Sequence, residues 1–319
     1  MNAAPAGDTE RQDAALLALL RVLAERGYGF VTPTPLTHAR VLARVERQQA
    51  RSVRDVLGWS LPFRRGEIDA EIEALLDRAE MLHADGAMLR SRVRVSSLHD
   101  RLFLHSAYPT DDTDSVFFGP DSYRFADLIR SELTSLSGRG PLRTLDIGTG
   151  SGVGAIVAAS ARPDALVCAT DINARALRFA RINAAAASVA IDAHHAPTLD
   201  TLDGVFDVIT ANPPYIIDAE SRLYRHGGGM HGAQLSLDMT RMALDRLAPG
   251  GRAILYTGSA IVDGGDALES ALADEASARG FTLRYRELDP DVFGEELDQP
   301  GYGDVERIAL VAAVITRPA

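Results

Sequence analysis

The four consecutive residues Asn212, Pro213, Pro214 and Tyr215 could form a ligand-binding feature at the end of a strand. They follow the apolar run FDVIT, which is typical of a buried strand, and neither proline can continue a ladder because proline has no N–H to donate. Open α/β sheets bind ligands at the carboxyl ends of their strands. The stretch therefore predicts a rigid polar tip at such an end, although the same dipeptides also occur in ordinary turns.

A second set of candidate residues surrounds a glycine-rich turn in the stretch TLDIGTGSGVGA. Asp146 ends an apolar strand there, and glycines follow at positions 148, 150, 152 and 154. Glycine lets the backbone approach a ligand closely and adopt a positive φ. Asp171 ends the next apolar run at about the separation where a carboxylate can accept the hydroxyls of a ribose. A tight turn and a helix cap are the alternative explanations of these residues.

The glycine-rich turn and Asp171 together indicate a cofactor that contains a nucleoside. A dinucleotide would place its pyrophosphate at the turn, where the carboxylate of Asp146 would repel it. S-adenosylmethionine carries an ammonium, a sulfonium and no phosphate, so it suits an acidic turn better.

From about Phe117 to Ile315, the chain resembles the class I S-adenosylmethionine-dependent methyltransferases, and among them the N-P-P-Y amino-methyltransferases that include release-factor glutamine methyltransferases. The resemblance rests on LDIGTGSG and NPPYI in this order. It implies a doubly wound, Rossmann-like α/β sheet of seven strands whose last strand is antiparallel. It also implies that S-adenosylmethionine lies against Asp146, Gly148, Thr149, Gly150, Asp171, Ile172 and Asn212.

The resemblance also implies a role for each of the residues Asn212, Pro213, Pro214 and Tyr215, which we call the tetrad. The side-chain oxygen of Asn212 and the backbone carbonyl of Pro213 would accept the two N–H bonds of a planar amino group, and the prolines would keep both acceptors fixed. Tyr215 would stack on the flat group and exclude water. The carbonyl dipoles would stabilise the positive charge that develops on nitrogen during methyl transfer.

Five further residues match the family more loosely. Pro120, Asp121, Ser122 and Tyr123, in the stretch FFGPDSYRF, would line the cofactor and substrate pocket, but a helix N-terminus with Asp121 or Ser122 as its cap explains the same residues without a ligand. His195 lies near the place of an acidic residue that contacts adenine in many relatives. We expect no metal, because no acid or cysteine near the paired histidines has ligand spacing. Cys168 lies in an apolar run and is expected to be a core residue.

The pattern of apolar residues predicts two domains. Residues 1–110 are expected to be mainly helical, with helices over 13–26, 37–56 and 67–82 and a hairpin, or β-wing, over 93–106. Residues 111–319 alternate short strands with helices and are expected to form the catalytic domain, with strands over 144–147, 165–170, 188–191, 206–211 and 252–257, helices over 173–187 and 233–247, and an antiparallel pair over 281–288 and 307–315.

Composition and charge limit the partners. The 319 residues carry a formal net charge of -11, which gives no general attraction to nucleic acid. Five arginines recur at helical spacing from Arg40 to Arg54 and could bind RNA phosphate or form a solvated face. An acidic loop over 289–307 could favour a cationic substrate, and a glycine-rich loop over 224–234 could close over it. The absence of a basic, apolar leader and of long apolar runs predicts a cytoplasmic protein with no membrane association.

The sequence therefore leaves three hypotheses for function, which differ in the methyl acceptor or in whether methyl transfer occurs at all. The first is N-methylation of a planar nitrogen on a protein glutamine or a nucleobase. The second is a small-molecule methyltransferase of a biosynthetic pathway, in which the helical domain forms a lid or the contact of a homodimer. The third is a sensor that binds S-adenosylmethionine without turnover.

Overall fold

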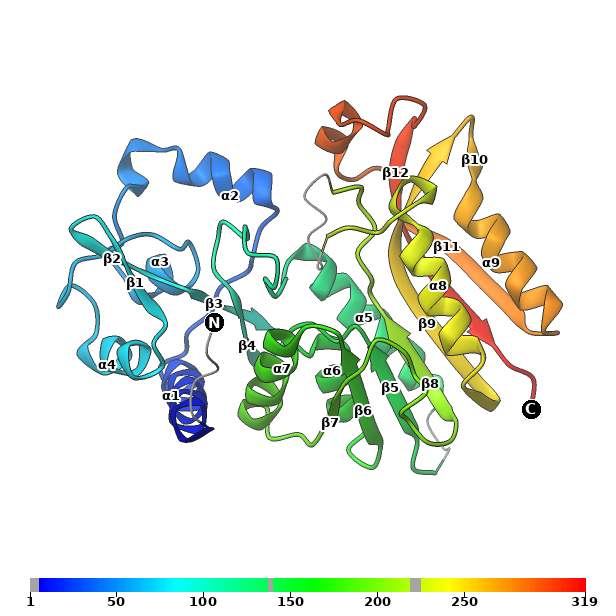
Figure 1. The fold of residues 1–319 in the computed structure, drawn as a ribbon, viewed down its shortest axis with the longest axis horizontal. Coiled ribbons are helices and arrows are strands. Elements are labelled where there is room, and N and C mark those ends of the chain that lie inside the picture. The colour runs from blue at the N-terminus through cyan, green and yellow to red at the C-terminus, as the bar shows by residue number, and fades with distance from the viewer. Residues whose placement is uncertain (1–5, 137–139, 219–224) are drawn as a thin grey trace.

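The computed structural model describes residues 6–136, 140–218 and 225–319. Figure 1 shows a smaller N-terminal part beside a larger part built on one central sheet. The N-terminal part contains α1 (Ala6–Glu25), α2 (Pro35–Leu42), η1 (Val45–Arg47), α3 (Val53–Leu57), α4 (Ala70–Arg78) and the strands β1 (Leu82–Asp85), β2 (Met88–Ser91), β3 (Val93–Leu98) and β4 (Arg101–Ser106).

The hairpin predicted over 93–106 is confirmed, because β3 pairs antiparallel with β4 from Val93 opposite Ser106 to Leu98 opposite Arg101. A second hairpin, β1 with β2, was not anticipated. It falls where the prediction extended a helix to residue 82, whereas α4 ends at Arg78. Glu80 there has a positive φ of 57°, which no helix continues.

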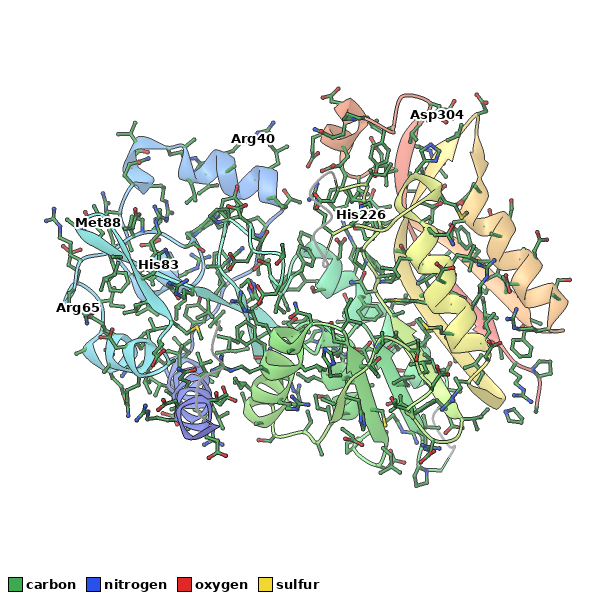
Figure 2. All side chains as sticks on the ribbon, viewed as in Figure 1. Arg40, Arg65, His83, Met88, His226 and Asp304 are labelled. Atoms are coloured by element: carbon green, nitrogen blue, oxygen red, sulfur yellow. The ribbon has the colours of Figure 1, made fainter. Side chains whose placement is uncertain are left out.

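The single helix predicted over 37–56 is wrong. The segment divides into α2, η1 and α3, because Thr34 caps the first helix and Ser52 starts a new one by accepting from the amide of Asp55. The arginines at positions 40, 44, 47, 51 and 54 therefore do not share one helix face. Arg40 projects from α2 in Figure 2, whereas Arg47 forms an ion pair with Asp55 at 2.8 Å.

The larger part is a doubly wound α/β sheet, as the sequence predicts. Its strand order is β11-β12-β9-β8-β5-β6-β7, and the short β10 pairs with β9 outside this path. The last strand, β12, runs antiparallel to both β9 and β11, as expected. The strands are β5 (Arg143–Ile147), β6 (Leu166–Asp171), β7 (Asp192–His195), β8 (Phe206–Ala211), β9 (Leu247–Val262), β10 (Gly265–Asp266), β11 (Thr282–Asp289) and β12 (Arg307–Thr316).

The third parallel strand lies four residues later than predicted, at β7 rather than at 188–191. Ser188 has a positive φ of 57°. The amides of Ser188 and Val189 donate to carbonyls in the last turn of α7 (Ala174–Ala186). The apolar residues of the predicted strand thus complete a helix end, and pairing begins where Asp192 lies opposite Cys168.

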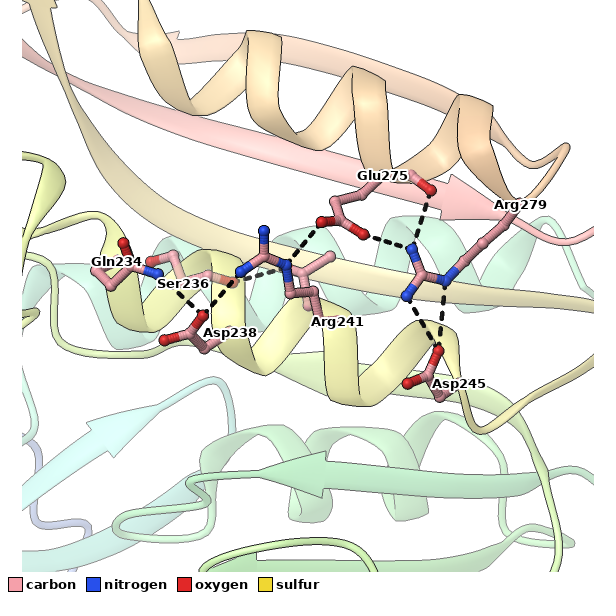
Figure 3. A network of polar contacts seen from close by, with 8 residues as sticks. Gln234, Ser236, Asp238, Arg241, Asp245, Glu275 and Arg279 are labelled. Atoms are coloured by element: carbon pink, nitrogen blue, oxygen red, sulfur yellow. Dashed lines mark hydrogen bonds and ion pairs between the residues drawn. The ribbon is translucent and has the colours of Figure 1, made fainter.

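Helices cover both faces of the sheet. On one face α5 (Pro120–Thr134) and α6 (Val153–Ala161) pack with buried residues of β9 and β12. On the other face lie α8 (Gln234–Leu244) and α9 (Ala267–Ala278), joined at the surface by a polar network through Arg241, Glu275 and Arg279 (Figure 3). The remaining helical turns are η2 (Met230–Gly232) and η3 (Gly294–Asp298). Within the described ranges, none of the helices combines the length and apolarity that crossing a bilayer requires.

The two parts share a buried contact. Phe179 and Ile182 of α7 belong to the apolar cluster that fills the N-terminal part. The fully buried amide of Asn183 accepts from the backbone N–H of Leu104 at 2.8 Å and donates to its carbonyl at 3.0 Å. It also donates to the carbonyl of Ser151 in the glycine turn, at 2.8 Å. The β3–β4 hairpin is therefore fastened to the turn through one side chain.

Candidate active site

The carboxyl ends of β5, β6 and β8 meet around a cavity of about 350 Å³, which we call the glycine-turn cavity. Seven residues that the sequence nominated for the cofactor line it: Asp146, Gly148, Thr149, Gly150, Asp171, Ile172 and Asn212. Gly148, Gly150 and Gly152 all have a positive φ, between 54° and 88°, as a tight turn from strand to helix requires. Met239 and Met242 of α8 add an apolar wall.

Asp146 forms the floor of this cavity. Its carboxylate is buried and accepts hydrogen bonds from the hydroxyls of Thr149 (2.6 Å) and Thr210 (2.7 Å) and from the amide of Ala155 (3.1 Å). A Cβ on Gly154 would lie 2.2 Å from its Oδ1, so this glycine is needed for close approach rather than for its φ. Burial raises the pKa of Asp146 to about 6, against the opposing effect of the two hydroxyls.

Asp171 lies at the end of β6, and each of its carboxylate oxygens accepts a hydrogen bond from a backbone amide. Oδ2 accepts from the amide of Gly150 and Oδ1 from the amide of Asn173, each at 2.8 Å. Burial raises the pKa of Asp171, and these amides oppose the shift. Each oxygen keeps a second lone pair that can accept a hydroxyl from a ligand in the cavity.

A second, smaller cavity of about 80 Å³ lies beside the tetrad, and we call it the tetrad cavity. Asn212 and Pro214 line both cavities, as does Phe117. The tetrad cavity also draws on distant parts of the chain, since its lining includes Thr34, Pro35, Pro120, Asp121, Pro213, Tyr215, Ile216, Arg225 and Phe293. The tetrad is thus the common wall of two adjoining spaces.

A buried carboxylate fixes the tyrosine of the tetrad. Tyr215 is 8% exposed, and its hydroxyl donates to Oδ2 of Asp121 at 2.8 Å. The hydroxyl of Tyr256 donates to the other oxygen at 2.9 Å. Burial raises the pKa of Asp121, and the two hydrogen bonds oppose that shift. The sequence nominated Tyr215 as an aromatic lid, and its hydroxyl is committed to the protein.

Of the loosely matched residues, Ser122 lines the glycine-turn cavity, and the others lie outside it. Pro120 lines the tetrad cavity instead. The hydroxyl of Tyr123 accepts from the amide of Thr32 at 3.0 Å, which ties α5 to the N-terminal part. His195 is exposed and its Nε2 lies 2.8 Å from the carbonyl oxygen of Ile172, while Ala196 and Pro197 line the cavity after it.

Sequence reasoning missed Thr34 and Pro35 of the N-terminal part, because a helix start explains them fully. It also missed Arg225, which pairs with the buried Asp218 at 3.3 Å and with Glu296 of the acidic loop. Part of that loop's charge is therefore neutralised within the protein. The glycine-rich loop forms η2 and a turn around it, and its predicted first residue, 224, lies outside the described residues.

The expectation that no acid or cysteine lies at ligand distance from the paired histidines is wrong. Potential ligand atoms of Cys168, Asp192 and His194 lie within 4.8 Å of one another, because neighbouring strands bring together residues far apart in sequence. These three side chains could hold a zinc ion with one further ligand. Burial and the nearby Asp192 raise the pKa of the Cys168 thiol, which disfavours a free thiolate. None of the three lines either cavity.

Comparisons with known proteins agree with this architecture. Residues 129–261 match the family model described as Methyltransferase small domain. Over 161 residues the chain is 35% identical to the release factor glutamine methyltransferase of Neisseria gonorrhoeae, covering 46% of this chain and 57% of that protein. The enzyme of the same name from Bordetella pertussis is 35% identical over 187 residues, covering 55% of this chain and 66% of that protein. The chain thus spans less than two thirds of the length of each of these relatives.

A solved structure supports the fold alone. A Pyrococcus horikoshii protein described as a transferase superposes with a TM-score of 0.50 at 12% identity, covering 78% of this chain and 82% of that one.

Proposed function

We propose that the chain, which matches a methyltransferase family model over residues 129–261 and is similar to release factor glutamine methyltransferases, transfers a methyl group from S-adenosylmethionine to the side-chain nitrogen of a protein glutamine. One observation carries the proposal. Asn212 and Pro214 line both cavities, so a cofactor in the glycine-turn cavity and an acceptor in the tetrad cavity would meet across the tetrad.

The glycine-turn cavity suits the cofactor in size and charge. Its volume of about 350 Å³ lies within the range of small-molecule sites. Asp171 has lone pairs left for the ribose hydroxyls, and Asp146 supplies a carboxylate near the turn, where the methionine part would lie. When bound, S-adenosylmethionine supplies a methyl group on a positively charged sulfur, and this C–S bond breaks as the new C–N bond forms.

The tetrad would orient the acceptor. An amide nitrogen is a weak nucleophile because its lone pair is delocalised. The Asn212 side-chain oxygen and the Pro213 carbonyl would accept its two N–H bonds, turn the lone pair toward the glycine-turn cavity and raise the electron density on nitrogen. The same oxygens would stabilise the positive charge that develops on nitrogen, until a proton leaves to water.

The two oxygens of Asn212 and Pro213 match the two N–H bonds of a planar amino group such as the one a carboxamide carries. The names of the relatives support the same acceptor. Residues 1–110 would form a domain that presents the protein substrate, since Thr34 and Pro35 reach the tetrad cavity. We place this reaction in the cytoplasm.

The proposal is tested with purified protein, S-adenosylmethionine labelled at the methyl group, and a release factor as acceptor. RNA and a small-molecule extract serve as competing acceptor pools. We expect label on one glutamine of the release factor and its loss when that glutamine is replaced by alanine. Label only in RNA or in small molecules would overturn the assigned acceptor, and cofactor binding without transfer to any pool would support a sensor instead.

A further inference from the structure

We propose that Asp121 is a positioning residue for methyl transfer, which holds the tetrad in place through the hydroxyl of Tyr215. This inference rests on the proposed function and adds a residue that touches neither the cofactor cavity nor the reacting nitrogen. Asp121 lines the tetrad cavity, but both of its carboxylate oxygens accept from tyrosines: Oδ2 from Tyr215 and Oδ1 from Tyr256.

The position of Asp121 in α5 favours a carboxylate. It is the second residue of the helix, after Pro120, where the unpaired amides of the first turn stabilise negative charge. The side chain is 5% exposed, so two donated hydrogen bonds replace the water it loses. A buried acceptor with two phenol donors is a rigid junction between α5, β9 and the tetrad.

The ring of Tyr215 is held as firmly as its hydroxyl. Gly258 of β9 lies against the ring, since a Cβ there would lie 2.3 Å from Cδ2 of Tyr215. Phe293 packs against the ring edge, with centroids 5.9 Å apart. Two prolines, each with a fixed φ, separate Tyr215 from Asn212. Fixing the tyrosine therefore also fixes the Asn212 side chain and the Pro213 carbonyl.

Tyr256 offers a matched comparison. It donates to the same carboxylate, but it belongs to the interior of β9, which β8 and β12 hold on both sides. Its backbone does not need Asp121 to stay in place. Loss of either hydroxyl leaves the carboxylate one donor short, yet only loss of the Tyr215 hydroxyl releases the tetrad.

The test compares kcat, acceptor KM and cofactor Kd for four variants: Asp121→Ala, Tyr215→Phe, Tyr256→Phe and the double variant of the first two. Asp121→Ala and Tyr215→Phe should each lower kcat about 10- to 100-fold, the loss expected when reacting groups are misplaced by about 1 Å. The double variant should lose no more than the worse single one, because both changes break the same link. Tyr256→Phe should keep kcat close to that of the unmodified protein.

Cofactor Kd should stay unchanged in all four variants, because Asp121, Tyr215 and Tyr256 do not line the glycine-turn cavity. Asp121→Asn should recover most of the rate, since its amide can still accept from one hydroxyl and donate to the other. Circular dichroism and cofactor binding identify a variant that has lost its fold, and the Asn and Phe variants, which keep the volume, then carry the test.

Three results would overturn the inference. They are an equal loss of kcat in Tyr256→Phe, additive losses in the double variant, and a loss seen only in cofactor Kd. If the unmodified protein transfers no methyl group to a release factor, the proposed function fails instead. The two failures are thus distinguished by the first measurement.

Discussion

The glycine-turn cavity and the tetrad cavity share Asn212 and Pro214, yet they are built in different ways. The first is lined by residues between 115 and 242, among them the turn after β5, where glycines with positive φ leave room, and the carboxylates of Asp146 and Asp171. The second is enclosed by five separate segments, around residues 34, 120, 214, 225 and 293. Of the two linings, only the second includes residues of the N-terminal part, Thr34 and Pro35.

This difference separates a cofactor site that lies within the sheet-containing part from an acceptor site that the N-terminal part helps to enclose. Changes in the first are expected to alter cofactor affinity or stability, and changes in the second to alter the rate of transfer. Substitutions at residues that line both cavities, and at residues that line only one, can show whether cofactor affinity and transfer rate change separately.

Replacing Asn212 by alanine should have the largest effect on transfer. The variant loses the side-chain acceptor that orients the amide, and we expect the rate to fall about 100- to 1000-fold, as when one preorganised polar group is removed from an active site. Calorimetric titration should show cofactor Kd nearly unchanged. A rate that survives, or a matching loss of cofactor affinity, would mean that the shared wall belongs to the cofactor site alone.

Asp146 should make the stability of the ligand-free protein depend on pH. Its folded pKa of about 6 lies above the usual 3.8, so the folded state holds the proton more tightly. The resulting stability is fully present below pH 3.8 and is lost as the pH rises through about 6, a change on the order of 3 kcal/mol at 1.36 kcal/mol per pKa unit. Denaturant unfolding from pH 4 to 7 should show this fall relative to Asp146→Asn, and parallel curves for the two proteins would contradict it.

Asp171→Ala should weaken the cofactor without slowing transfer at saturation. Loss of hydrogen bonds to a charged group costs about 1.5–3 kcal/mol, which is about 10- to 100-fold in Kd. Asp274→Ala, on the exposed face of α9, removes the same charge at a residue that lines neither cavity and should leave Kd unchanged. Equal effects of the two changes would indicate that only net charge matters.

Gly258→Ala should produce the smallest effect, and on the acceptor side alone. The new Cβ would meet the ring of Tyr215 at 2.3 Å, and we expect a loss of stability of about 1–3 kcal/mol with a lower kcat and an unchanged cofactor Kd. Gly294→Ala is the matched control, because no atom lies within 4 Å of a Cβ there. A normal kcat in the Gly258 variant would show that the tyrosine ring can move without cost to transfer.

The polar residues of the cofactor site could be predicted because each lies in a short motif whose residue types follow from local geometry. The glycine turn, Asp171 and the tetrad each follow an apolar strand, and parallel strands place their carboxyl ends at one edge of a sheet. The antiparallel pair at the end of the chain could be predicted for a similar reason, since no helix separates its two strands.

The rest depends on contacts that no local pattern reveals. Asp121 looks like an ordinary helix-start residue until Tyr215 and Tyr256 reach it from 94 and 135 residues away. The five arginines follow helical spacing, but Arg47 folds back onto Asp55 and Ser52 starts a new helix. Cys168 and His194 become neighbours only because β6 and β7 pair in one particular register.

The three hydrogen bonds of Asn183 limit how this chain can be recombined with its relatives. A chimaera that takes its first 110 residues from another protein must present a backbone N–H and carbonyl to this amide at the position of Leu104, and an apolar surface to Phe179 and Ile182. A mismatch there would be transmitted to Ser151, and so to the turn that shapes the cofactor site. The exchangeable unit is therefore the N-terminal part together with α7, even though α7 lies within the sheet-containing half of the sequence.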